Sequence, residues 1–113
     1  MVDETAVVAE CRARFPDSRI ELVSVQTRVG LFVLRSPSLT EFRAYQLSLR
    51  DDAMRGEAAR NLFATICAYP APVEVASLLD RWGGLISHPK IQNALGWLVG
   101  QQDELLGKAW PAP

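Results

Sequence analysis

The segment over residues 19–35 constrains the fold more than any other part of the chain. Its residues favour extended backbone and lack helical spacing; the apolar ones are Ile20, Leu22, Val23, Val25, Val29, Leu31, Phe32, Val33 and Leu34. Thr27–Gly30 interrupts this run, and Gly30 can adopt a positive φ. The pattern predicts a β-hairpin with strands over about 19–26 and 30–35. Because two strands alone are only marginally stable in water, a helical layer must cover one of their faces.

The residues before the hairpin predict one short amphipathic helix over residues 3–15. Val7, Cys11 and Phe15 recur there every four residues, which places them on one helix face. Pro16 ends the pattern, because proline lacks the backbone N–H that a continuing helix needs.

A capping box begins the first helix after the hairpin. Ser38 stands three residues before Glu41, so the hydroxyl and the carboxylate can each bind a free N–H group at the helix start. This helix extends to about residue 50, and one face of it carries Leu39, Phe42, Tyr45 and Leu49.

Three further helical patterns complete the chain, separated by proline and glycine residues. One runs from Asp51 to about Ala68, and we expect its inward residues to be Met54, Ala58, Leu62, Phe63 and Ile66. The next begins at Pro72 and has an apolar stripe of Val75, Leu78, Leu79 and Trp82. The last runs from Pro89 to about Gly107 and repeats Ile91, Ala94, Leu95 and Leu98.

These patterns predict a mainly helical α+β fold: an N-terminal helix, one β-hairpin and then four helices. A chain of 113 residues has the length of a single domain. We therefore expect one domain over residues 1–107, followed by a flexible C-terminal tail over residues 108–113, which contains two prolines and little to pack.

Composition argues against several function classes. The 12 basic and 13 acidic residues leave a net charge of −1, so there is no overall positive field to hold nucleic acid or an anionic membrane. Acidic residues are interspersed among the arginines, which favours a solvated surface over a phosphate-binding track. No apolar run approaches the roughly 20 residues of a membrane span, and the acidic start is unlike a secretory signal. We expect a cytoplasmic protein that binds neither nucleic acid nor membrane.

Catalytic chemistry has little support in the sequence. His88 is the sole histidine, and it precedes Pro89 at an expected helix start with no nucleophile or carboxylate motif beside it. Cys11 and Cys67 lie in helical patterns, where small buried thiols are common. The glycines form no phosphate-binding loop. We therefore expect no enzyme activity, no cofactor and no metal site.

The tryptophans lie in the C-terminal third of the chain. Trp82 fits the apolar stripe of its helix, which predicts a core position. Trp97 falls off the main row of the last helix, so it is either partly exposed or packed against a neighbouring helix. Trp110 lies in the expected tail. Exposed aromatic side chains are favoured anchors for protein partners.

The order of the motifs adds a family resemblance. The second expected strand continues as FVLRSPSLTEFRAY, and RNLFATICAYPAPVEVASLLDRWGGL follows it some residues later. Over roughly residues 10–100 this order resembles the small tail assembly chaperones of long-tailed bacteriophages and related tail-like elements. The matching positions are Phe32, Arg35, Pro37, Ser38, Glu41, Phe42, Arg43, Leu62, Cys67, Tyr69, Pro70, Leu78, Leu79, Gly84 and Leu85. Ser36 and Leu39 stand where the family often carries basic residues.

The resemblance implies a non-enzymatic protein that binds the tape-measure protein and keeps it soluble while tail tube subunits assemble around it. A small partner with an apolar groove can cover such a long amphipathic chain before the tube encloses it. Two alternatives are a structural or accessory component of the phage tail or virion, and, from another class, a small DNA-binding regulator. Homo-oligomers through the apolar faces of the C-terminal helices are a further expectation.

The expected partner surface combines the first helix after the hairpin with the C-terminal helix. Its candidate residues are Arg35, Phe42, Arg43, Tyr45, Trp97 and Trp110. The aromatic side chains would form an apolar centre and the two arginines a charged rim. For Phe42 there is a competing interpretation, because it shares its helix row with Leu39 and Leu49 and can equally belong to the core.

Overall fold

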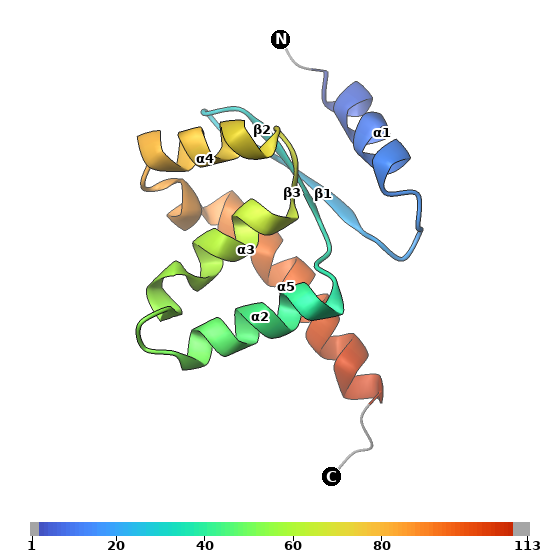
Figure 1. The fold of residues 1–113 in the computed structure, drawn as a ribbon. Coiled ribbons are helices and arrows are strands. Elements are labelled where there is room, and N and C mark those ends of the chain that lie inside the picture. The colour runs from blue at the N-terminus through green and yellow to red at the C-terminus, as the bar shows by residue number, and fades with distance from the viewer. Residues whose placement is uncertain (1–2, 110–113) are drawn as a thin grey trace.

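The computed structural model describes the backbone of residues 3–109 and the side chains of residues 3–101. The described residues form an α+β fold, mainly helical, with five α-helices and a three-stranded antiparallel sheet (Figure 1). The elements in chain order are α1 (Glu4–Arg14), β1 (Leu22–Gln26), β2 (Leu31–Arg35), α2 (Leu39–Arg50), α3 (Ala58–Ile66), β3 (Cys67–Tyr69), α4 (Pro72–Arg81) and α5 (Pro89–Ala109). The expected α+β class, the N-terminal helix and the hairpin are confirmed.

Strands β1 and β2 form the predicted hairpin, closed by a turn at Thr27–Gly30. Strands β1 and β2 pair antiparallel from Leu22 opposite Arg35 to Gln26 opposite Leu31. Thr27 and Gly30 exchange two backbone hydrogen bonds of 2.9 and 3.1 Å across the turn. Gly30 has a φ of +146°, a conformation that side chains rarely allow, so glycine is required there.

Strand β3 was not expected from the sequence. It pairs antiparallel with β2, with Val33 opposite Tyr69, so the sheet order is β1-β2-β3. The helical pattern predicted to reach about Ala68 ends at Ile66 instead. Two causes favour this change. The open edge of β2 offers hydrogen-bonding partners to the backbone of β3, and Pro70 disfavours helical backbone angles at Tyr69, the residue before it.

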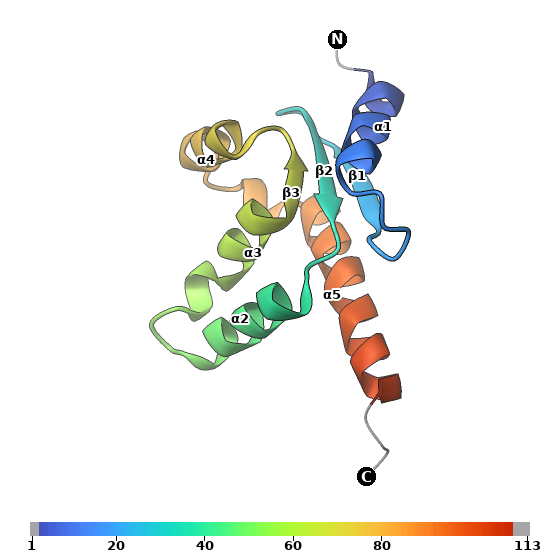
Figure 2. The same cartoon turned by 45° about the vertical axis from the view of Figure 1, so that its right-hand side comes forward.

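Helices cover both faces of the sheet, as Figures 1 and 2 show. Alternate residues of β2 point to opposite sides, and Phe32 and Leu34 face the larger cluster formed with α3, α4 and α5. The rings of Phe32 and Phe63 meet edge to face, with their centroids 5.5 Å apart. Leu31 and Val33 face a smaller cluster on the other side; α1 and β3 complete it with Val7, Cys11 and Ala68. The central strand is therefore buried on both faces.

The segment between α2 and α3 is less regular than predicted. A turn at Asp51, whose carboxylate accepts the N–H of Ala53 at 2.9 Å, is followed by one 3₁₀ turn over Arg55–Glu57. Gly56 disfavours α-helix there, so α3 begins only at Ala58. The expectation that Met54 points inward was wrong, because its side chain is exposed in this turn.

Trp82 was also misplaced by the sequence pattern. Helix α4 ends at Arg81, and Trp82 follows it with non-helical backbone angles, which turn its side chain out of the apolar stripe to 50% exposure. A second 3₁₀ turn, Leu85–Ser87, leads into α5, and the half-buried His88 caps that helix by accepting the N–H of Lys90 at 3.1 Å.

Helix α5 continues past Gly100 and Gly107 to Ala109, so neither glycine ends it. Most of the predicted tail, residues 110–113, lies outside the described residues. No helix in the described part of the chain is long and apolar enough to cross a bilayer.

Candidate functional site

The junction between β2 and α2 is held by an ion pair. Arg35 donates two hydrogen bonds of 2.8 Å to the two carboxylate oxygens of Glu41, and a third of 3.2 Å to the carbonyl of Thr65. The predicted capping box is present, with Ser38 and Glu41 exchanging bonds of 2.8 and 3.2 Å. The Arg35 guanidinium lowers the pKa of Glu41 to about 2. Arg35 is thus occupied within the fold and is not a free rim charge for a partner.

Phe42 lies in the core, which decides between the two interpretations of this residue. Its side chain is only 1% exposed, on the buried side of α2. It therefore presents no surface to a partner in this structure.

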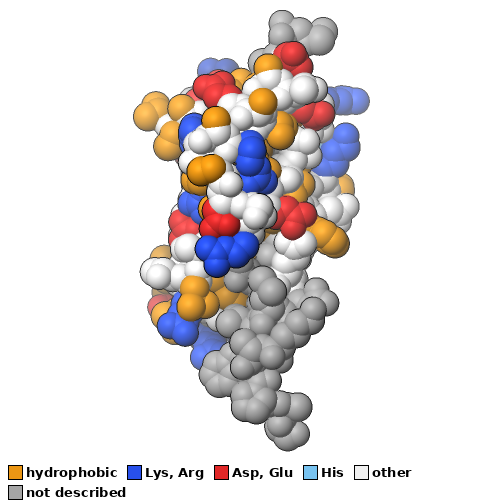
Figure 3. Space-filling view, turned by 90° about the vertical axis from the view of Figure 1, so that its right-hand side faces the viewer, with side chains coloured by type: hydrophobic (Ala, Val, Ile, Leu, Met, Phe, Trp, Pro, Cys, Tyr) orange, Lys and Arg blue, Asp and Glu red, His pale blue; other side chains and the backbone are white. Residues whose placement is uncertain are grey.

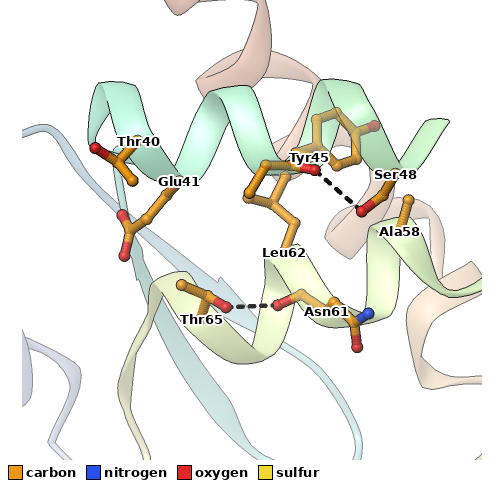
Figure 4. Close-up of a pocket in the computed structure, with 9 residues that line it drawn as sticks. Thr40, Glu41, Tyr45, Ser48, Ala58, Asn61, Leu62 and Thr65 are labelled. Atoms are coloured by element: carbon orange, nitrogen blue, oxygen red, sulfur yellow. Dashed lines mark hydrogen bonds between the residues drawn. The ribbon is translucent and has the colours of Figure 1, made fainter. Parts of the chain in front are cut away.

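Tyr45 lies at a groove between α2 and α3 with a volume of about 340 Å³, and Figure 4 draws the residues that line it. Its apolar lining comes mainly from Ala44, Tyr45, Ala58 and Leu62, and Thr40, Glu41, Ser48, Asn61 and Thr65 complete the lining. The hydroxyls of Ser48 and Thr65 donate to carbonyls of their own helices, at 3.0 and 2.8 Å. These two hydroxyls are therefore already hydrogen-bonded within their helices, and the apolar part of the lining offers a place for an apolar side chain.

A row of exposed leucines lies on another side of α2. Leu39 and Leu47 are 45% and 65% exposed, and Arg43 stands between them at the four-residue spacing of one helix face. Arg50 extends the same side of the helix. We call Leu39, Arg43, Leu47 and Arg50 the α2 surface. Sequence reasoning missed Leu47, although its position off the Phe42 row was a readable signal of exposure.

Trp97 is 56% exposed, which confirms the first of its two predicted placements. Its indole N–H donates to the Glu21 carboxylate at 3.2 Å, and it borders a groove beside β1 together with Val23 and Val25. Tyr45 instead lines a small cavity together with Leu95 and Val99 of α5. The structure thus does not bring Tyr45 and Trp97 onto one surface.

Two candidate residues remain, Arg43 and Trp110. Arg43 is exposed and forms no ion pair with described residues. Trp110 lies outside the described residues. On the face drawn in Figure 3, basic and acidic side chains alternate instead of forming one basic track.

Both thiols are protonated groups of the interior. Burial raises the pKa of Cys67 to about 12, and its Sγ–H donates to the Tyr69 carbonyl at 3.0 Å. Burial also raises the pKa of Cys11. Thiols in this state are poor nucleophiles and poor metal ligands. Within residues 3–101, no three histidine, cysteine or carboxylate side chains gather as metal ligands would.

Comparison with known proteins adds no relative: no family model, curated protein or solved structure matches the chain.

Proposed function

We propose that this chain is a non-enzymatic assembly chaperone that covers an apolar helical segment of a longer partner protein. The model for this role is the phage tail assembly chaperone, which binds the tape-measure protein in the cytoplasm while the tail tube forms. The observation that carries the proposal is the α2 surface, where exposed leucines alternate with arginines that have no ion-pair partner among the described residues.

The α2 surface has the size and chemistry of a helix-binding site. Leu39 and Leu47 stand two helical turns apart, which at 1.5 Å per residue is about 12 Å. A partner helix can place apolar residues against both leucines and acidic residues against Arg43 and Arg50. This complementarity describes an amphipathic helix with an acidic flank, the type of segment that aggregates when it has no cover.

The residues that carry the family resemblance have mostly structural roles in this fold. Phe32, Phe42 and Leu62 are buried, while Arg35 and Glu41 pair with each other. The resemblance therefore supports a shared framework, and the binding properties depend on the exposed positions. At one of these, Leu39 replaces the basic residue common in the family, which makes the α2 surface more apolar.

A pair of matched variants tests the proposal. The test needs a candidate partner, for which we choose the product of any very long, helix-rich reading frame found next to the gene, and co-express it with this chain. Leu47→Gln should lower the soluble fraction of that partner several-fold, because it removes the most exposed leucine of the α2 surface. Val73→Gln on α4 is the control, since Val73 is 84% exposed but lies on another helix. Equal solubility with both variants would refute the assignment.

The two alternative functions predict other outcomes. A structural component of the tail or virion would remain in purified particles, whereas a chaperone is absent from them. A DNA-binding regulator would be retained on DNA and released steeply as the salt concentration rises.

A further inference from the structure

A second pocket lies between the hairpin turn and the end of α4, and none of its lining residues belongs to the α2 surface. The turn contributes Thr27, Arg28 and Val29, and the other wall is formed by Arg81–Leu85 together with His88. Its volume is about 340 Å³. Figure 1 shows α4 beside the turn that connects β1 to β2.

The pocket combines an apolar lining with positive charge. Trp82 is half-exposed here, and Val29 and Leu85 add apolar walls. Arg28 and Arg81 supply two guanidinium groups, and no carboxylate is among the lining residues.

These two guanidinium groups are unused within the described part of the molecule. Most arginines bind a carboxylate or a backbone carbonyl of the same chain, as Arg35 and Arg60 do. The described arginines whose side chains have no such partner are Arg28, Arg43, Arg50 and Arg81. One pair is on the α2 surface and the other borders this pocket.

We propose that this pocket binds an acidic peptide segment of a partner protein. An aliphatic or aromatic side chain of the peptide packs against Trp82, and a neighbouring carboxylate pairs with Arg28 and Arg81. Guanidinium groups bind carboxylates with two parallel hydrogen bonds, and aromatic faces favour both apolar and cationic neighbours. The proposal does not depend on the chaperone function, because it uses other residues on other elements.

The test uses the full ¹⁵N-labelled chain and nuclear magnetic resonance. The probe is a capped tetrapeptide of alternating aspartate and leucine, and its matched control has asparagine in place of aspartate. We expect saturable shifts of the Trp82 indole N–H, assigned with Trp82→Phe, and of the Gly83 and Gly84 amides. The asparagine peptide should bind at least tenfold more weakly.

Three variants then test whether Arg28 and Arg81 bind the carboxylates of the peptide. Arg28→Gln and Arg81→Gln should each weaken the acidic peptide at least fivefold. Arg19→Gln removes the same charge from a side chain that is 89% exposed and lies outside both the pocket and the α2 surface, so it should leave the affinity unchanged. Amide spectra of each variant establish that it is folded.

Several results would overturn the inference. These are equal binding of both peptides, no saturable shift at millimolar peptide, or an Arg19→Gln variant as weak as the other two. Inorganic phosphate producing the same shifts at the same concentration would indicate a simple anion site. Failure here leaves the α2 surface untouched, and failure of the Leu47→Gln test leaves this pocket untouched.

Discussion

Glu41 offers the sharpest test of how the strand–helix junction is stabilised. Its pKa lies at about 2, compared with 4.5 for the free side chain, chiefly because Arg35 donates two hydrogen bonds to the carboxylate. One pKa unit corresponds to about 1.4 kcal/mol, so ionised Glu41 contributes up to about 3 kcal/mol to the free energy of unfolding at neutral pH. The side chain of Glu41 is 24% exposed, which limits screening by solvent.

The Glu41→Gln variant should therefore have a free energy of unfolding about 2–3 kcal/mol lower than that of the wild type at pH 7. The sign of the pH dependence follows from the lowered pKa in the folded state. The stabilisation is complete above the unfolded pKa of 4.5 and is lost as the pH falls from there towards 2. The difference between wild type and variant should shrink over that interval.

Urea denaturation followed by tryptophan fluorescence, at pH 7 and at steps down to pH 2.5, measures this difference. Glu74→Gln is the matched control, because Glu74 is an exposed acid in the first turn of α4. It should change the free energy of unfolding by less than about 0.5 kcal/mol at either pH. A difference between wild type and Glu41→Gln that stays constant from pH 7 to pH 2.5 would refute the reasoning.

Three further predictions concern the core, the turn and the thiols. Phe42→Ala should lower the free energy of unfolding by about 3–5 kcal/mol in urea, because it empties a fully buried site; a loss below about 1 kcal/mol would place Phe42 at the surface. Gly30→Ala should lower the free energy of unfolding by about 1–3 kcal/mol, because residues with a side chain rarely adopt a φ of +146°. An unchanged midpoint of thermal unfolding would contradict that turn geometry. Cys11 and Cys67 should resist a thiol reagent at pH 8 in the native chain and react after unfolding, since both are buried with raised pKa values; rapid native labelling would contradict this.

The parts of the fold that the sequence predicted depend on local physical chemistry. The hairpin follows from β-branched residues around a glycine that accepts positive φ, and the start of α2 follows from the Ser38–Glu41 capping box. In each case the residues that decide the structure are neighbours in the chain. Strand β3 is different, because its three residues become extended through pairing with β2, more than 30 residues earlier.

The candidate site was predicted less well, for a related reason. Which side of a helix faces solvent depends on how neighbouring helices are placed. Phe42 and Tyr45 were both on the expected face of α2, yet only Tyr45 reaches a groove. Trp97 was correctly placed off the core row of α5, but its rotation towards β1 and away from α2 is a tertiary property. The exposure of Leu47 agrees with its position off the Phe42 row, whereas Trp82 is exposed because α4 ends just before it, which periodicity does not reveal.

The sheet order has a consequence for aggregation. With β2 in the centre, β1 and β3 are edge strands, and exposed edges can pair with strands of other molecules. Strand β3 is three residues long and is followed by Pro70, which cannot donate to a further ladder. On β1, the ammonium of Lys90 binds the carbonyl of Gln26 at 3.2 Å, placing a charge at that edge. Both edges thus carry features that oppose strand addition, so the sheet resists pairing edge to edge with strands of other molecules.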